Sequence, residues 1–265
     1  MKKSTIKQDG SIKILTQNLR CADDPGGNSI SERFVRFRRL VMEYKPDLIG
    51  AQEVTMTWKN YLLEAMSEYG IVGEPREAII DPEHTAILYK KERFELLETK
   101  TFALSESGEF GSLGWGEEYP RICTYAILKD KESGDRLAFF NSHLALRDEA
   151  RCENLKLIFE HIEKFGLPTL FTGDFNTSEA SAPYKLCMDT IFDDTKYLAK
   201  DSDDGYTCHN YDDEKYDGRL KDSPIDYCMC SKGDFEVESY KIVRDKIDGL
   251  PVSDHYPVIA KLTLK

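Results

Sequence analysis

The chain has 265 residues, a formal net charge of -12 and a pI near 5.0. This length suits one large domain, and because no linker, low-complexity tract or repeat interrupts it, we expect a single domain over residues 1–265 that begins with a short disordered segment, residues 1–10. The acidic balance argues against tight nonspecific binding to nucleic acid, but it does not exclude a phosphate-containing substrate, since a bound divalent metal reverses the local field.

The first predicted elements are a strand and a helix. The N-terminus, MKKSTIKQDGS, has no apolar run behind its lysines, so no secretion signal is predicted. The segment SIKILTQNL alternates apolar and polar residues, which indicates a strand that ends near Asn18. Ser29 and Glu32 form a capping-box pattern before a helix that Pro46 ends.

Further along, the chain changes from alternating elements to consecutive strands. A short apolar strand, DLIGAQE, ends at Glu53, and a second helix is predicted over TWKNYLLEAMSEY, ending at Gly70. From residue 84 to residue 144 strand-like segments follow one another: TAILY, FELLET, TFAL, ICTYAILK and RLAFFNSHL. An amphipathic helix, DEARCENLKLIFEHIEKF, comes next. The last third contributes three more strands, PIDYCMC, EVESYKIVRD and YPVIAKLTL.

The segment LPTLFTGDFNTS, residues 167–178, ends an apolar strand on Asp174 and Asn176. If the chain stays extended, this two-residue spacing sends both side chains to the same side. Two oxygen-bearing groups at the edge of a core suit a hard cation or an attacking water. By itself, however, this segment favours the alternative of an Asx-type turn, because Asp and Asn hydrogen-bond to their own backbone.

The cysteines indicate a reducing compartment. Their number, seven, is odd, and no Cys-x-x-Cys spacing occurs, so we interpret them as reduced thiols. Cys228 and Cys230 share a face of a predicted strand, where core packing is favoured over a metal pair. No segment is long and apolar enough to span a membrane, and we expect a cytoplasmic protein.

Several predicted strands begin or end in polar residues. Two β-α-β stretches, each followed by more strands, indicate two sheets that pack on each other with helices outside. Ligands of layered proteins collect at strand ends, so we expect convergence of the polar residues found there: Asn18, Glu53, His143, Asp174 with Asn176, and Asp226.

Six short motifs occur in a fixed order: QNLR, AQE, NSHL, TGDFNT, PIDY and SDHYPV. From about Ile12 to Leu264 this series resembles the endonuclease/exonuclease/phosphatase superfamily. The resemblance implies a deoxyribonuclease I-like α+β fold, a four-layer α/β/β/α sandwich of two packed mixed sheets flanked by helices. It also implies metal-dependent hydrolysis of phosphate esters. Ala145 and Leu146 stand where an acidic residue and a His are common, a departure that bears on substrate preference.

The resemblance also implies ligands for a Mg²⁺ or Mn²⁺ ion. Asn18 and Glu53 match the strand-end pair near the metal, and Asp254 matches a carboxylate on the metal or on its water. Few protein ligands, with water and substrate phosphate completing the shell, are typical of Mg²⁺. Asp174 and Asn176 match the pair beside the scissile phosphate, where Asp174 positions or deprotonates water and Asn176 holds an oxygen.

Two histidine–carboxylate pairs complete the implied catalytic set. Glu83 matches the carboxylate that orients His143, and Asp226 matches the one behind His255. A carboxylate behind an imidazole sets its tautomer and favours the charged form. We hypothesise that His255 stabilises the phosphate in the transition state and that His143 supports the leaving group. The general base is either Asp174 or His255.

Three further residues are candidates for substrate binding. Arg121 is interpreted as a phosphate contact or as a surface residue before a strand. Trp115, which shares a Gly-rich loop with Tyr119, forms either a substrate wall or a cap on the core. His209 is either a substrate contact or structural.

The sequence therefore predicts a Mg²⁺- or Mn²⁺-dependent phosphoesterase, either a phosphodiesterase or a phosphatase. Because no basic stripe is visible, we expect a small-molecule or single-stranded substrate and no obligatory protein partner. The alternatives are a nuclease, which requires basic residues around the pocket, and a binding module that has lost catalysis.

Overall fold

Two β-sheets form the centre of the molecule. The computed structural model describes residues 10–211 and 223–265, so the expected disordered segment 1–10 lies, apart from Gly10, outside the described residues. The first sheet has the order β10-β12-β13-β1-β2-β4-β3, in which the strands are β1 (Ile12–Asn18), β2 (Leu48–Val54), β3 (Tyr69–Val72), β4 (His84–Lys90), β10 (Asp201–Ser202), β12 (Phe235–Ile242) and β13 (Val258–Leu264). The second sheet has the order β5-β6-β7-β8-β11-β9, in which the strands are β5 (Phe94–Ala103), β6 (Ile122–Asp130), β7 (Arg136–His143), β8 (Thr169–Asp174), β9 (Phe192–Asp194) and β11 (Asp226–Ser231).

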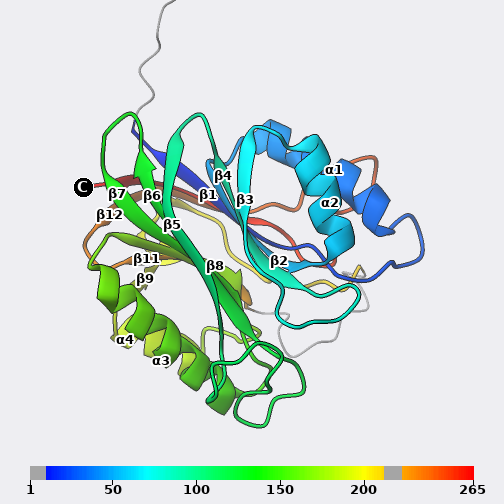
Figure 1. The fold of residues 1–265 in the computed structure, drawn as a ribbon. Helices are drawn as coiled ribbons and strands as arrows, with labels where there is room; N and C mark the ends of the chain where they lie inside the picture. The colour runs from blue at the N-terminus through cyan, green and yellow to red at the C-terminus, as the bar shows by residue number, and fades with distance from the viewer. Residues whose placement is uncertain (1–9, 212–222) are drawn as a thin grey trace, which may run out of the picture.

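Helices cover the outer faces of both sheets (Figure 1). The helices are α1 (Ile30–Tyr44), α2 (Met56–Ala65), α3 (Asp148–Phe165), α4 (Ala182–Asp189) and the single turn α5 (Thr195–Leu198). One apolar cluster lies between the sheets, a second joins α1 and α2 to the first sheet, and a third joins α3 and α4 to the second sheet. The expected α/β/β/α sandwich is therefore confirmed.

Most local expectations hold, with two corrections. The segments FELLET and TFAL, predicted as separate strands, form the single strand β5, because both pair with β6. Ser29 forms the predicted capping box with Glu32, and Cys228 and Cys230 both pack in the core between the sheets. The helix predicted up to Gly70 is wrong at its end: α2 stops at Ala65, and Tyr69 begins β3. The reason is tertiary, because the buried Tyr69 donates a hydrogen bond from its hydroxyl to the Pro46 carbonyl (2.6 Å), while β3 pairs with β4.

The register of the central strands brings polar residues to one edge of the sandwich. Strand β1 runs parallel to β2, and β7 runs parallel to β8, so that His143 lies beside Asp174. Strand β11 is antiparallel to β8 and starts where β8 ends, which sets Asp226 beside Asp174. Neighbouring parallel strands end at the same edge of a sheet. The polar residues at the strand ends therefore converge, as expected from the sequence.

A buried polar cluster ties the two sheets together. Asn141 of β7 donates hydrogen bonds to two carbonyl groups of the first sheet (2.9 Å each) and accepts one from Gln52 (2.7 Å). The sheets approach closely here because Gly50 has no side chain. A β-carbon at Gly50 would overlap the Thr172 hydroxyl and lie 2.6 Å from Asn141 Oδ1.

Replacing Gly50 by Ala is expected to lower the free energy of unfolding by about 2–3 kcal/mol, since overpacking forces side chains out of their rotamers. Urea denaturation of the variant and of the wild type measures this difference. The double variant Gly50→Ala, Thr172→Ala should recover part of the loss, because one of the two overlapping groups is removed. An unchanged unfolding midpoint in Gly50→Ala would show that the sheets separate more easily than the packing implies.

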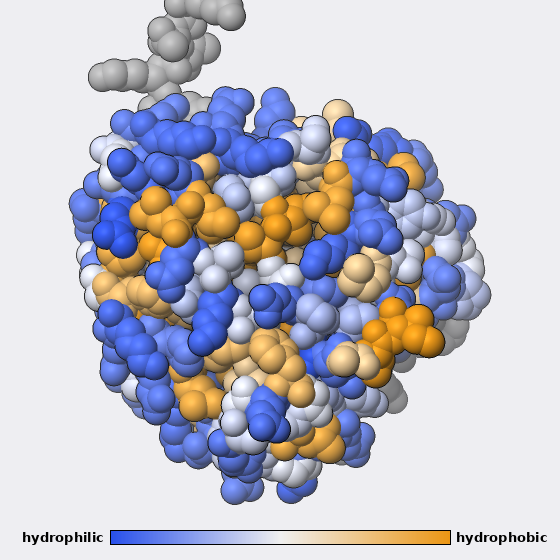
Figure 2. Space-filling view, in the orientation of Figure 1, coloured by the Kyte–Doolittle hydropathy of each residue, from blue (hydrophilic) through white to orange (hydrophobic). Residues whose placement is uncertain are grey.

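Within residues 10–211 and 223–265, no helix combines the length and the apolar character needed to cross a bilayer. On the face seen in Figure 2, hydrophobic residues lie in groups separated by hydrophilic ones.

Candidate active site

A cavity of about 360 Å³ opens where the polar strand ends of the two sheets meet. Its lining residues are Asn18, Arg20, Cys21, Glu53, Arg76, Glu83, Tyr119, Arg121, His143, Leu146, Asp174, Asn176, Asp254 and His255. Of the residues expected at the site, Asp226, His209 and Trp115 are not among them. Asp226 lies directly behind His255, whereas the other two have different surroundings.

Asn18 bridges two carboxylates of the cavity lining. Its Nδ2 group donates hydrogen bonds to Glu53 Oε1 and to Asp174 Oδ2 (both 3.0 Å). The other oxygen of Glu53 accepts the backbone N–H of Cys21 (2.8 Å). Burial opposes ionisation of Glu53, but the hydrogen bonds from Asn18 and Cys21, and His143 whenever it carries a proton, lower the pKa of this carboxyl group below its ordinary value. Glu53 is therefore an ionised carboxylate that faces the cavity.

Asp174 forms an Asx turn and also faces the cavity. Its Oδ1 accepts the backbone N–H of Asn176 (2.9 Å), where the chain turns with φ of 53°. The chain is therefore not extended through this pair: it forms the Asx turn that this segment by itself favours, and Asn176 reaches the cavity by way of the turn. Asp174 Oδ2 remains directed at Asn18 and lies 3.5 Å from His143 Nε2. Burial, helped by the neighbouring Asp226, raises the pKa of Asp174 to about 7.

His255 forms the predicted pair with Asp226. Its Nδ1 lies 2.9 Å from Asp226 Oδ2, and Asp226 is fully buried. Burial lowers the pKa of His255, but the charge and hydrogen bond of Asp226 outweigh burial and hold this pKa well above its ordinary value. One donor atom each from Asp174, Asp226 and His255 lies within 4.8 Å of the others, a spacing that also suits a metal ion.

His143 is not oriented by Glu83, contrary to the sequence-based expectation. Among the described residues its Nδ1 is buried without a hydrogen-bond partner. Glu83 instead forms a two-point ion pair with Arg76, at 3.0 and 2.9 Å. Burial and the positive charge of Arg121 lower the pKa of His143 well below its ordinary value. The two histidines therefore differ: His255 favours the charged form and His143 the neutral form.

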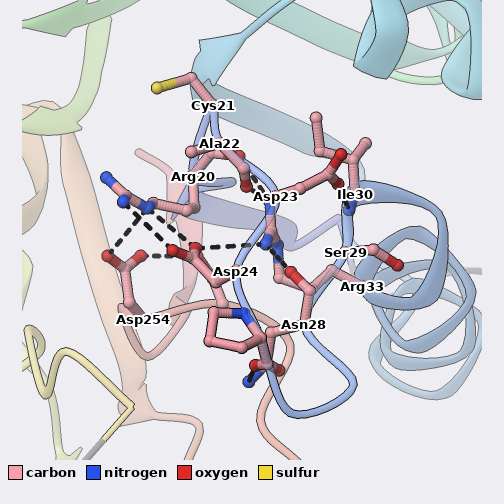
Figure 3. Close-up of polar contacts among 12 residues, drawn as sticks. Arg20, Cys21, Ala22, Asp23, Asp24, Asn28, Ser29, Ile30, Arg33 and Asp254 are labelled. Atoms are coloured by element: carbon pink, nitrogen blue, oxygen red, sulfur yellow. Dashed lines mark hydrogen bonds and ion pairs between the residues drawn. The ribbon is translucent and has the colours of Figure 1, made fainter.

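Asp254 lines the cavity beside Arg20, an arginine that was not among the expected site residues. Arg20 Nε lies 3.0 Å from Asp24 Oδ2 and 3.8 Å from Asp254 Oδ2, so that its guanidinium joins the two carboxylates (Figure 3). Burial raises the pKa of Asp254. The signal for Arg20 was available, because it belongs to the motif QNLR, two residues beyond Asn18.

Arg121 lies at the cavity with an unpartnered guanidinium. The residue is 6% exposed, and within the described part of the chain its side chain forms neither a hydrogen bond nor an ion pair. The ring of Tyr119 lies against it, with the ring centroid 5.9 Å from the guanidinium carbon. Burial lowers the pKa of Arg121, and the carboxylates of Asp174, Glu83 and Glu117 oppose this only through their charge, without a direct contact. A buried guanidinium without a direct partner is costly, since the charge has lost its water. The side chain thus offers an unused binding site for an anion.

His209 and Trp115 lie away from the cavity lining. His209 is 1% exposed and stacks on Tyr256 with ring centroids 4.1 Å apart, while its backbone N–H donates to the Asp254 carbonyl (2.9 Å). His209 is thus buried against Tyr256 and does not line the cavity. The backbone N–H of Trp115 donates to the Glu106 carboxylate (3.1 Å), and Tyr119 is the aromatic residue of this loop that lines the cavity.

Comparison with known proteins agrees with this geometry. Residues 15–255 match the Endonuclease/Exonuclease/phosphatase family. Over 178 residues the chain is 26% identical to human tyrosyl-DNA phosphodiesterase 2; the match covers 65% of this chain and 44% of that protein, so the chain spans less than half of this relative. A solved structure of a protein of the same family from Bacteroides thetaiotaomicron has a TM-score of 0.87 at 28% identity, covering 95% of this chain and 94% of the other.

A mannosyl-6-phosphatase of Bacteroides thetaiotaomicron has a TM-score of 0.85 at 27% identity, covering 95% of this chain and 99% of the other.

The family match, from residue 15 to residue 255, includes most of the sequence, and the chain therefore belongs to the Endonuclease/Exonuclease/phosphatase family. The resemblance carried by the six motifs is confirmed. Members of this family are hydrolases that act on phosphate esters.

Proposed function

We propose that the chain is a Mg²⁺- or Mn²⁺-dependent hydrolase of phosphate esters. The observation that carries the proposal is the unpartnered guanidinium of Arg121 in a cavity that also holds the carboxylates of Glu53, Asp174 and Asp254. Such a cavity has oxygen ligands for a cation and a separate positive charge for an anion. A phosphate ester bound to a divalent metal satisfies both requirements.

Asn18, Glu53 and Asp254 are the residues that we assign to the metal. The fit rests on donor chemistry, because carboxylate and amide oxygens are the ligands that Mg²⁺ and Mn²⁺ prefer. Burial raises the pKa of Asp254, so its charge lacks full compensation without a cation. A bound metal would neutralise the phosphate charge that otherwise repels a nucleophile. Asp226 is not assigned to it, since its oxygen already bonds to His255.

The remaining roles follow from position around the cavity. Asp174, held by Asn18 and by the Asx turn, positions and deprotonates the attacking water. His255, held by Asp226, donates a hydrogen bond to a phosphate oxygen and stabilises the charge of the transition state. We assign His255 no role as the base because its Nδ1 is bonded to Asp226. His143 faces the leaving group.

Arg121 binds a non-bridging oxygen of the scissile phosphate, and Asn176 holds another. A guanidinium that is already buried and oriented has little entropy to lose when the anion binds. Neither Trp115 nor His209 is included in the substrate site, because both lie away from the cavity lining.

A small substrate is favoured over a nucleic acid polymer. Two of the three arginines at the cavity, Arg20 and Arg76, pair with carboxylates within the described residues, so they do not form the basic cluster that a nuclease requires. The similarity to a mannosyl-6-phosphatase supports a phosphatase, and the similarity to human tyrosyl-DNA phosphodiesterase 2 keeps single-stranded nucleic acid as the second candidate substrate. All seven cysteines are free, which supports a cytoplasmic location.

Hydrolysis of p-nitrophenyl phosphate and bis-p-nitrophenyl phosphate tests the activity. With Mg²⁺ or Mn²⁺ we expect release of p-nitrophenol, and with EDTA we expect none. The ratio of the two rates distinguishes a phosphatase from a phosphodiesterase. Equal release in EDTA would contradict the metal dependence, and no release from any phosphate ester would favour a binding module.

Metal binding has a readout that does not depend on turnover. Mg²⁺ at about 100 times its Kd should raise the melting temperature by about 5 °C, because an ion that binds only the folded state stabilises it. Glu53→Gln should abolish this rise, since the variant removes a charged oxygen ligand. Glu153→Gln, on the exposed face of α3, is the matched control and should keep the rise. An identical rise in both variants would contradict the assignment of Glu53.

A further inference from the structure

The ion pair between Arg76 and Glu83 is part of the cavity lining. Besides the two side-chain contacts, the backbone N–H of Arg76 donates to the Glu83 carbonyl (2.9 Å), and the Arg76 carbonyl accepts the N–H of Gly111 (2.8 Å). The side chains of Arg76 and Glu83 remain 12% and 18% exposed. The segment between β3 and β4 therefore presents a rigid pair of opposite charges to the cavity.

This pair retains unused hydrogen-bonding capacity. Arg76 uses three of its five N–H donors, two on Glu83 and one on Glu77 (3.2 Å). Each oxygen of Glu83 has a further lone pair. A hydroxyl group both donates and accepts hydrogen bonds, so it matches a donor and an acceptor held side by side. Two adjacent hydroxyl groups can use this pair more fully than one hydroxyl group can.

Tyr119 adds an apolar surface beside this pair. The guanidinium carbons of Arg76 and Arg121 lie 5.7 and 5.9 Å from the centroid of its ring, and 45% of the residue is exposed. Leu146, also on the cavity lining, is 45% exposed. The ring and the aliphatic side chain provide contact area for the C–H face of a sugar ring, next to groups that bind its hydroxyls.

The position of this surface relative to the catalytic residues indicates what it binds. His143, Glu53 and Arg121 line both the cavity and a small adjoining void of about 10 Å³ that also touches Arg76 and Glu83. The assigned phosphate site and the Arg76–Glu83 pair are thus neighbours on the side of His143, where the leaving group departs. A cavity of about 360 Å³ is large enough for a phosphorylated monosaccharide.

We propose that Arg76, Glu83 and Tyr119 form a leaving-group subsite for a polyhydroxylated alcohol, so that the substrate is a sugar phosphate. This inference rests on the proposed function and names its substrate class. Arg76 and Glu83 hydrogen-bond the sugar hydroxyls, and Tyr119 packs against the ring. These three are binding residues and take no part in proton transfer.

The test compares two phosphate monoesters in the presence of Mg²⁺, mannose 6-phosphate and ethyl phosphate, by release of inorganic phosphate. Ethyl phosphate has the same reacting group without the hydroxyls. In each of the variants Arg76→Gln, Glu83→Gln and Tyr119→Ala we expect kcat/KM for mannose 6-phosphate to fall about tenfold or more, mainly through KM. The kcat/KM for ethyl phosphate should change less than about twofold.

Matched controls use the same substitutions outside the cavity lining, on the exposed Arg39 and Tyr197 and the half-exposed Glu153: Arg39→Gln, Glu153→Gln and Tyr197→Ala. They should leave both substrates unaffected. Equal losses on both esters in the subsite variants would show that the ion pair only supports the structure, which overturns the proposal. A short single-stranded oligonucleotide serves as a third substrate. If the subsite variants lower kcat/KM for the oligonucleotide alone, the proposal is overturned in favour of a nucleotide subsite.

A binding measurement separates this inference from the proposed function. Calorimetric titration of mannose 6-phosphate into Asp174→Asn should give a Kd that Arg76→Gln in the same background weakens about tenfold. If wild-type enzyme hydrolyses both esters equally and this Kd is unchanged, the phosphoesterase stands and the sugar subsite is rejected. If binding weakens as expected but no ester is hydrolysed with any metal, the subsite stands and the proposed function is rejected.

Discussion

Asp174→Asn is expected to lower the kcat of phosphate ester hydrolysis by about a thousandfold, with little change in KM. The amide keeps the acceptor of the Asx turn with Asn176 but cannot take a proton from water. Loss of general-base action alone accounts for an effect of about this size. Steady-state kinetics on p-nitrophenyl phosphate with Mg²⁺ measures the effect, and the unchanged melting temperature of the variant shows that it is folded.

Asp248→Asn is the matched control, because Asp248 is an exposed carboxylate whose partner, Arg39, lies on the surface. It should retain full activity. His255→Ala should also lose activity, since the group that stabilises the phosphate charge is removed. If Asp174→Asn keeps kcat within about tenfold of the wild type while His255→Ala does not, Asp174 is not the base and the assignment between these two residues is reversed.

Arg121→Met is expected to have opposite effects on activity and on stability. We expect kcat/KM to fall about a hundredfold, because a preorganised donor to the phosphate is lost. The free energy of unfolding should rise by about 1–3 kcal/mol, since a buried charged group without a partner is replaced by an apolar one of similar length. Kinetics with p-nitrophenyl phosphate and urea denaturation without substrate measure the two quantities.

The combination of these effects identifies a binding residue, whereas a structural arginine would lose stability on substitution. Arg121→Lys should recover part of the activity, because a point charge replaces the guanidinium without its planar geometry. Arg39→Met, which changes an exposed arginine, should affect neither quantity. A loss of stability in Arg121→Met would mean that Arg121 supports the fold and would remove it from the phosphate site.

Residues that end or begin a strand were predictable, and the structure explains why. The apolar alternation before Asn18 and the apolar run before Asp174 mark strands without knowledge of their neighbours. Parallel pairing then brings such ends together, as it does for His143 and Asp174. The family motifs indicated the same residues. The pair of Asp226 with His255 could be expected in the same way, because each belongs to a motif of the series.

Loop residues were less predictable. Trp115 and Tyr119 occupy one Gly-rich loop, and nothing in the local pattern distinguishes the ring that lines the cavity from the one that does not. Arg76 belongs to none of the six motifs. Its position depends on the contact between the segment that joins β3 to β4 and the loop that contains Gly111, and only the packing of the chain brings these two segments together.

The pattern along the chain was therefore sufficient for the layers of the fold, the family and most of the polar residues around the cavity, because strand periodicity and motif residues are encoded locally. Which charged side chains pair with each other was determined only by the tertiary structure. Glu83 pairs with Arg76 and not with His143, and Arg121 is left with an unpartnered guanidinium. Ion pairing depends on the distance between side chains from different segments and on their burial, and both arise only when the sheets and loops pack together.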